Sequence, residues 1–181
     1  PNPCRECAGD GRVRARQTIN IKIPAGVETG NRIQMSGRGE VGPGGGPAGD
    51  LYVEIVERAH EYLVREGDNL HIQIGISMAH AALGTHVQVE GIDGTLDVDI
   101  KAGTQSGSTI VLKGKGVTHL RSTSRGDLIV HVEVQTPVKL NREQEELLRK
   151  FADARGEKDG EIHLSNRDGG VFGKLRGAFH R

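Results

Sequence analysis

Two cysteines near the start of the chain are the residues best suited to chemistry. Cys4 and Cys7 form a Cys-x-x-Cys pair, and Gly9 and Gly11 follow it closely. Two cysteines cannot build a disulfide framework, and a pair at this spacing in a reducing compartment is more often metal-binding or redox-active. Structural zinc takes four ligands in a tetrahedron, so this pair could supply half of a zinc site. The spacing alone equally allows a turn that simply carries two thiols.

The other candidate sites are weaker. The eight His are scattered, with no His-x-x-x-His pair on a predicted helix and no Ser or Cys beside an evident His partner, so we expect no enzyme. Gly37, Gly39 and Gly42 have the spacing of a dinucleotide-binding fingerprint, but no helix is predicted after them. We expect His60 to pack or to form a hydrogen bond.

Charge and composition argue against two classes of partner. The chain has 24 Lys and Arg against 24 Asp and Glu, with three Phe, two Tyr and no Trp. Proteins that bind nucleic acid or anionic membranes normally carry a basic excess, and base stacking needs aromatic side chains. No apolar run approaches the roughly 20 residues that span a bilayer. We therefore expect a cytoplasmic protein with neither nucleic acid nor membrane as a partner.

The elements that must position these residues are mostly strands. Apolar residues alternate over residues 18–23, 51–55, 70–76, 96–100 and 128–134, which predicts short, half-buried strands in antiparallel sheets. Two helices are predicted at residues 78–83, between Ser77 and Gly84, and at residues 142–155, where Asn141 and Gln144 form a capping box. Glycine-rich turns separate the strands.

An internal repeat at a spacing of 77 residues organises the strands. Residues 18–26 match residues 95–103, and the register holds without a gap until Gly49-Asp50-Leu51 falls on residues 126–128. The matched positions are mainly glycines and apolar residues. The repeat predicts a mainly β fold of two tandem, similar β-sandwich domains with short helices. Residues 62–94, which precede the second copy, have no counterpart in the first, so we expect its first strands upstream of residue 1 and an unpaired sheet edge.

Most of the chain resembles the DnaJ co-chaperones of the zinc-finger class. Residues 4–11 match their Cys-x-x-Cys-x-Gly-x-Gly motif, in particular its last repeat. Their C-terminal client-binding domains are matched by residues 23–26, 37–39, 49–53, 65–70, 82–84, 102–107, 113–116 and 126–128. The resemblance implies a truncated DnaJ with four parts. Residues 1–12 would be a remnant of the zinc finger, 13–61 an incomplete client-binding domain, 62–138 a second one, and 139–181 a C-terminal helix and dimerisation region.

The resemblance also implies functional residues. Cys4 and Cys7 would be zinc ligands in the intact protein, in a site that is incomplete in this chain. The groove for unfolded polypeptide would be lined by Ile19 and Val53, with Ile21 and Leu51 as further candidates. The alternative is that all four are ordinary core residues, and for Ile21 and Leu51 core packing is the better explanation. Homodimerisation would use anchors in the helix and tail, namely Leu147, Leu148, Phe151 and Phe172.

The resemblance implies a function without enzymatic chemistry. The chain would bind unfolded polypeptide, prevent its aggregation and present it to a DnaK-type chaperone, whose ATPase a domain outside this chain would stimulate. Two alternatives remain. One is a zinc-ribbon interaction module acting through the Cys end. The other is thiol-disulfide exchange through Cys4 and Cys7, which needs a lowered thiol pKa, typically from a helix N-terminus, whereas Gly9 and Gly11 indicate a turn.

Overall fold

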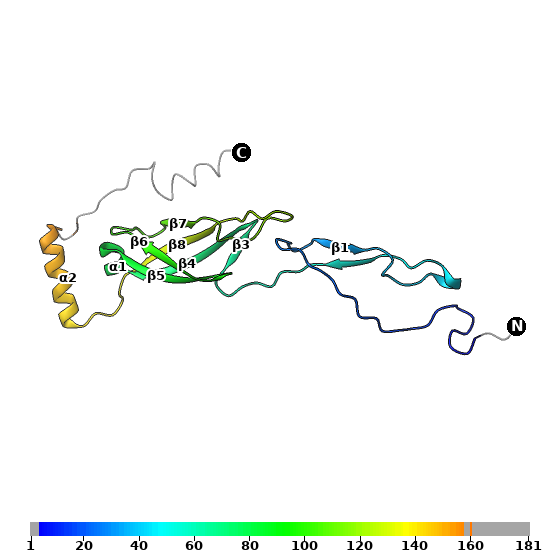
Figure 1. Cartoon of the computed structure of the whole chain (residues 1–181). Coiled ribbons are helices and arrows are strands. Elements are labelled where there is room, and N and C mark those ends of the chain that lie inside the picture. Colours follow the sequence, from blue (N-terminus) through cyan, green and yellow to red (C-terminus); the bar gives the residue numbers. More distant parts are fainter. Residues whose placement is uncertain (1–3, 158–159, 161–181) are drawn as a thin grey trace, which may run out of the picture. The chain divides into compact units, whose positions relative to one another are not determined.

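The computed structural model describes residues 4–157 and residue 160. The chain divides into two compact units, Pro1–Thr136 and Pro137–Arg181, each described by itself. The first unit contains two β domains in succession, and the second contains the helix α2 (Arg142–Arg155). The fold is mainly β with short helices, as the sequence predicted (Figure 1).

The second β domain is a sandwich of two sheets. One has four strands in the order β3-β4-β8-β7, and the other pairs β5 with β6. The strands are β3 (Val64–Glu66), β4 (Asn69–Ser77), β5 (Thr85–Gly91), β6 (Gly94–Ile100), β7 (Thr109–Leu112) and β8 (Leu128–Gln135). Aliphatic side chains of both sheets share one core, in which Leu128 and Val130 are 0% exposed and Val98 is 1% exposed.

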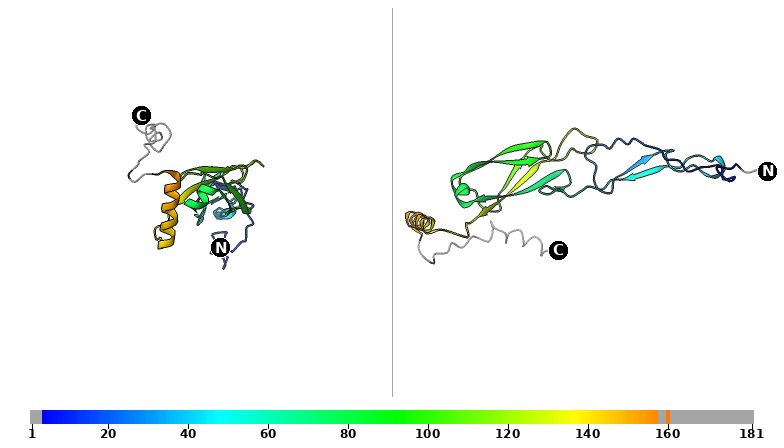
Figure 2. Two further views of the ribbon diagram at one scale, coloured as in Figure 1. Left: turned by 90° about the vertical axis from the view of Figure 1, so that its left-hand side faces the viewer. Right: turned by 90° about the horizontal axis from the view of Figure 1, so that it is seen from below.

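Helix α1 (Met78–Leu83) connects the two sheets at one end of this domain (Figures 1 and 2). It begins where the sequence predicted, because the Ser77 hydroxyl accepts a hydrogen bond from the His80 N–H (3.2 Å). Gly84 ends it with a φ of 84°. A Cβ at Gly84 would lie 3.1 Å from the Ile100 carbonyl oxygen, so glycine suits both the backbone and the close packing.

One prediction about the sheets was wrong, because the central pair β4 and β8 is parallel. Leu70 lies opposite Leu128, and Ser77 lies opposite Gln135. Alternation shows which side chains share a face but carries no information on strand direction. A parallel return needs a long crossover, which α1, β5, β6 and β7 provide. The other strand pairs are antiparallel, as predicted.

The first β domain contains one strand pair in the described part of the chain. β1 (Arg32–Met35) and β2 (Leu51–Glu54) are antiparallel, and the short helical turn η1 (Pro43–Gly45) lies in their connection. The strand predicted at residues 18–23 is not formed, since residues 12–24 carry no strand. An apolar alternation supplies a face, but a strand also needs a hydrogen-bonded partner, and no described residue pairs with this segment.

The predicted repeat is confirmed at the level of individual hydrogen bonds. Ile33 pairs with Val53 in the first domain, and Ile110 pairs with Val130 in the second. The turn that follows each first strand is closed in the same way. Its bonds are Gly37 N–H to Asp50 Oδ1 (2.9 Å) and Gly114 N–H to Asp127 Oδ1 (2.8 Å), with Gly39 N–H to Gly49 O (2.7 Å) and Gly116 N–H to Gly126 O (2.8 Å).

The second unit is built on α2, whose ends follow the sequence prediction. The Asn141 side chain accepts the Gln144 N–H (2.9 Å), and the Gln144 side chain accepts the Asn141 N–H (3.0 Å), which completes a capping box. Gly156 ends the helix in the left-handed region at φ 71°. Among the described residues, no helix combines the length and apolarity required to cross a membrane.

Candidate functional site

The Cys-bearing segment is a series of tight turns. The Cys4 carbonyl accepts the Ala8 N–H (2.8 Å), and the Cys7 carbonyl accepts the Asp10 N–H (2.8 Å). Gly9 follows with a φ of 93°, a conformation that favours glycine. The turn that Gly9 and Gly11 predicted is therefore confirmed.

This turn lowers the pKa of Cys4 without a helix. The backbone N–H of Glu6 is the largest cause, followed by the backbone N–H and then the side chain of Cys7, and burial opposes the shift weakly. Both cysteines are free thiols, with Cys4 exposed and Cys7 half-buried. Amide dipoles aimed at a sulfur stabilise its thiolate, whether they belong to a turn or to a helix end. The absence of a helix thus does not argue against a reactive Cys4.

The same geometry fits half of a zinc site. Zinc binds thiolates, and the lowered pKa of Cys4 favours that form. Within residues 4–157 and 160, no three or more His, Cys, Asp or Glu side chains gather into a metal-binding group. A tetrahedral site that uses Cys4 and Cys7 would therefore draw its other two ligands from outside these residues.

We expect Cys4 to be alkylated at lower pH than an unstructured cysteine. Its depressed pKa means that the thiolate persists as the pH falls through the range where a free thiol becomes protonated. Iodoacetamide labelling at a series of pH values, followed by mass spectrometry of the peptide that carries Cys4, measures this midpoint. The same chain in denaturant is the control, and equal midpoints in the two states would contradict the turn's effect on the thiol.

The predicted client-binding residues lie in the first β domain. Leu51 and Val53 occupy the half-buried face of β2, where they pair with Met35 and Ile33 of β1. Ile19 and Ile21 lie on the segment before β1 and are also half-buried, but outside any strand. The structure thus joins Leu51 and Val53 on one sheet face, whereas Ile19 and Ile21 belong to a separate segment.

The repeat shows how the matching positions are buried in the second copy. Leu128 and Val130, which match Leu51 and Val53, are 0% exposed, and Val98, which matches Ile21, is 1% exposed. Leu96, which matches Ile19, is only partly buried at the margin of the core. Ile19 is therefore a peripheral position, whereas the other three are core positions that are incompletely covered in the first domain.

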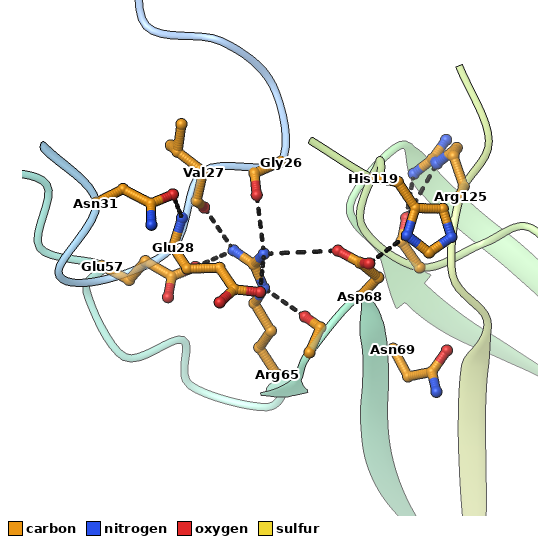
Figure 3. A network of polar contacts seen from close by, with 12 residues as sticks. Gly26, Val27, Glu28, Asn31, Glu57, Arg65, Asp68, Asn69, His119 and Arg125 are labelled. Carbon is orange, nitrogen blue, oxygen red and sulfur yellow. Dashed lines mark hydrogen bonds and ion pairs between the residues drawn. The ribbon is translucent and has the colours of Figure 1, made fainter. Parts of the chain in front are cut away.

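A polar network around Arg65, which no sequence pattern indicated, lies at the junction of the two β domains (Figure 3). The Arg65 side chain is 17% exposed and comes from β3. Its guanidinium donates to the carbonyl oxygens of Val27 (2.8 Å), Gly26 (3.2 Å) and Gly67 (2.7 Å). The same group bonds to Glu57 and pairs with Glu28 (3.3 Å) and Asp68 (3.8 Å).

Two further contacts close this junction. A Cβ at Gly26, which has a φ of 85°, would lie 2.2 Å from the Thr118 carbonyl oxygen, so only glycine allows this approach of the backbones. His119 Nδ1 bonds to the Asp68 carboxylate. Arg65, Asp68 and Gly26 are visible in the sequence as parts of motifs, but no local pattern indicates that they meet.

His60 has the hydrogen-bonding role that the sequence predicted. Its Nδ1 accepts the N–H groups of Tyr62 and Leu63, both at 3.2 Å. Leu63 is 7% exposed and belongs to the core of the second domain. The His60 side chain therefore fixes the point at which the chain enters the second domain.

Three of the four predicted dimerisation anchors lie on helix α2. Leu147 and Phe151 on α2 are 59% and 56% exposed, and Leu148 is half-buried. The Arg155 guanidinium lies over the Phe151 ring, 5.7 Å from its centre. Phe172 lies outside the described residues. Helix α2 thus presents an apolar stripe with no fully buried residue.

Known proteins are similar to this chain over most of its length. The family model described as "DnaJ C terminal domain" matches residues 6–137. "Chaperone protein DnaJ 2" of Streptomyces avermitilis is 58% identical over 192 residues, which cover 98% of this chain and 51% of that protein. "Chaperone protein DnaJ 1" of Mycolicibacterium paratuberculosis is 53% identical over 180 residues, which cover 99% of this chain and 47% of that protein. This chain therefore spans about half the length of these relatives, and it belongs to the DnaJ C-terminal domain family.

Proposed function

We propose that this chain is the client-holding part of a DnaJ co-chaperone. It binds unfolded polypeptide, limits its aggregation and presents it to a DnaK-type chaperone in the cytoplasm, with no enzymatic step of its own. The observation that carries the proposal is the first β domain, whose apolar residues match core positions of the second domain but remain half-exposed. The relatives are named chaperones, which agrees with this role.

The proposed binding mode is addition of an extended client segment beside β2. In the second domain, β8 has a strand on each side, whereas its counterpart β2 pairs only with β1 among the described residues. Backbone hydrogen bonds at such an edge give affinity for any sequence, and apolar side chains beside it select apolar clients. Val53 and Ile19 are the proposed contacts, and Leu51 and Ile21 are further candidates.

We expect replacement of Ile19 and Val53 by serine in the full-length protein to weaken capture of an unfolded client about tenfold. The two changes together remove apolar contact worth on the order of 1–2 kcal/mol. Suppression of the aggregation of a chemically denatured client measures this effect, and zinc content should stay unchanged.

Val56→Ser is the matched control, because Val56 lies just after β2, is 72% exposed, and corresponds at the 77-residue spacing to the exposed Glu133 rather than to a core residue. Unaltered capture by the Ile19 and Val53 variant would contradict the proposed site. Loss of zinc in that variant would indicate instead that the finger had been damaged.

We further propose that Cys4 and Cys7 ligate zinc in the intact protein, where two more ligands complete the site. The lowered pKa of Cys4 supports this role and equally suits thiol-disulfide exchange, the second candidate function. Insulin reduction separates the two. A zinc ligand pair should show no catalysis of insulin reduction in the full-length protein, whereas a redox pair should lose its activity in Cys4→Ser.

The apolar stripe of α2 is our proposed homodimerisation surface. We expect Leu147→Glu with Phe151→Glu to shift the sedimentation coefficient of the 181-residue chain from dimer to monomer, because an exposed apolar stripe is covered most simply by a second copy. Arg149→Glu, on the opposite side of the helix, is the control and should remain dimeric. If the unmodified chain already sediments as a monomer, the proposal is wrong.

A further inference from the structure

The outer face of the four-stranded sheet carries a cluster of two histidines and a carboxylate. Glu66, His71 and His131 come from the neighbouring strands β3, β4 and β8. Burial alternates along β4, so that Leu70 and Ile72 lie in the core and His71 lies on the opposite face. The two histidines are 60 residues apart in the sequence, so their spacing gives no local signal that they meet.

The two histidines meet through one ring nitrogen each. His71 Nδ1 lies 2.9 Å from His131 Nε2, a distance at which one nitrogen donates a hydrogen bond and the other accepts it. A histidine that binds a metal through one nitrogen almost always donates its other N–H to a nearby acceptor, which fixes the orientation of the ring. His131 can be that acceptor. With the proton of His71 on Nδ1, its Nε2 carries the electron pair that a metal ion needs.

Nε2 of His71 is buried and has no hydrogen-bond partner in the described part of the chain. Oε2 of Glu66 lies 3.1 Å from it, yet this contact does not have the geometry of a hydrogen bond. Two ligands of one metal ion lie about 2.9–3.4 Å apart, because bonds of about 2.0–2.1 Å enclose angles between a right angle and the tetrahedral angle. The nitrogen and the oxygen are therefore spaced as two ligands of a single ion.

The charges nearby leave Glu66 available to an incoming cation. Its side chain is 82% exposed, and within the described residues it forms no ion pair with Lys or Arg. The carboxylate that follows on the same face of β8, Glu133, accepts a hydrogen bond from the Gln73 amide (2.7 Å). Because no group of three or more His, Cys, Asp or Glu ligands exists among the described residues, an ion held by His71 and Glu66 keeps its other positions for water.

We propose that Nε2 of His71 and Oε2 of Glu66 bind Zn²⁺ or a similar divalent transition-metal ion, and that His131 positions the His71 ring. An imidazole with a carboxylate suits zinc, whereas magnesium and calcium prefer oxygen ligands alone. The site uses neither cysteine, so it is independent of the zinc ligands proposed above. The ion ties the edge strand β3 to β4, and it thereby steadies the strand that carries Arg65 of the domain junction.

The test is calorimetric titration of the 181-residue chain with zinc chloride, after replacement of Cys4 and Cys7 by serine to remove the thiols. We expect one zinc ion to bind per chain and magnesium chloride to give no binding heat. His71→Ala should abolish zinc binding, and Glu66→Gln should weaken it about tenfold. His131→Phe should also weaken it about tenfold, the usual effect of losing the group that orients a ligand. His131→Gln should recover most of the affinity, because its amide oxygen can accept the same hydrogen bond.

His86→Ala is the matched control, because Nδ1 of His86 lies 3.4 Å from the Asp99 carboxylate in the same domain, but its side chain is 84% exposed. This variant should bind zinc normally. Thermal unfolding gives a second readout, since zinc should raise the Tm of the cysteine-free chain and of His86→Ala but not that of His71→Ala. If His71→Ala does not fold, Glu66→Gln decides, because Glu66 is exposed. No zinc binding by the cysteine-free chain, unchanged binding in Glu66→Gln, or loss of binding in His86→Ala would each overturn the site.

Discussion

Replacement of Leu128 by alanine should lower the free energy of unfolding by about 3 kcal/mol, whereas the same change at Leu51 should lower it by about 1 kcal/mol. The two positions are equivalent in the repeat and differ in burial. Leu128 is 0% exposed in the core of the second domain, and Leu51 is half-buried on β2. Alanine at Leu128 leaves a cavity that the sandwich cannot fill, while alanine at Leu51 leaves a surface that water already reaches.

Urea denaturation followed by circular dichroism measures the two changes in the 181-residue chain. Hydrogen exchange at the amides of β8 and β2 then assigns each loss to its own domain. Val111→Ala on β7 is a useful control, because Val111 is 49% exposed and should cost little. Equal losses at Leu51 and Leu128 would show that the first domain has a closed core, and they would remove the main support for the proposed client groove.

The repeat explains why so much of the fold could be predicted from the sequence. A glycine with positive φ, an Asp that accepts the N–H of a turn and an alternating strand are all local features, and each recurs 77 residues later. The Asp50 carboxylate shows the physical content of the motif. Its pKa is lowered, first by the Gly37 N–H and then by the Gln34 amide, so it closes the turn as a charged group. Turns and strands that depend on such local features can be predicted from a single sequence.

Features that depend on distant partners could not be predicted in the same way. The parallel pairing of β4 and β8 depends on the path of the whole crossover, and the alternation in each strand is compatible with either direction. Residues 18–23 have the composition of a strand, but a ladder also requires a second segment, and the described part of the chain supplies none. The alternation of apolar residues therefore predicts which side chains share a face, but it does not predict whether or with which strand a segment pairs.

The candidate sites show the same difference between local features and features that depend on distant partners. Cys4 and Cys7 were found because their spacing is a local signal, and His60 because it precedes a domain entry. The Arg65 network was missed, since its acceptors lie on three separate segments and three of them are backbone carbonyls. Every residue has a carbonyl oxygen, so no side-chain pattern indicates which of them accept a hydrogen bond from this arginine. Only the fold shows that this arginine joins the domains.

Replacement of Arg65 by alanine should lower the free energy of unfolding by about 2–3 kcal/mol and expose the link at residues 56–62 to protease. Arg65 is largely buried, and its loss would leave the carbonyls of Gly26 and Val27 without this donor and would remove the cationic partner of the Glu57 carboxylate. Arg65→Lys should recover less than half of the loss, because an ammonium group cannot reproduce the planar set of donors. Urea denaturation and limited proteolysis measure the two effects.

The pH dependence of this junction provides an independent check. Burial alone would raise the pKa of Glu57, but the hydrogen bonds from Arg65 and from the Thr29 N–H outweigh it and leave that pKa lowered. A carboxyl with a depressed folded-state pKa stabilises the fold above its unfolded pKa, and this contribution is lost as the pH falls through the folded value. Arg65→Ala should therefore flatten the acid limb of the stability profile. Arg32→Gln, which breaks an exposed pair with Glu54, should change stability by no more than about 0.5 kcal/mol. If Arg65→Ala and Arg32→Gln behave alike, the junction is held by backbone packing at Gly26 rather than by its arginine.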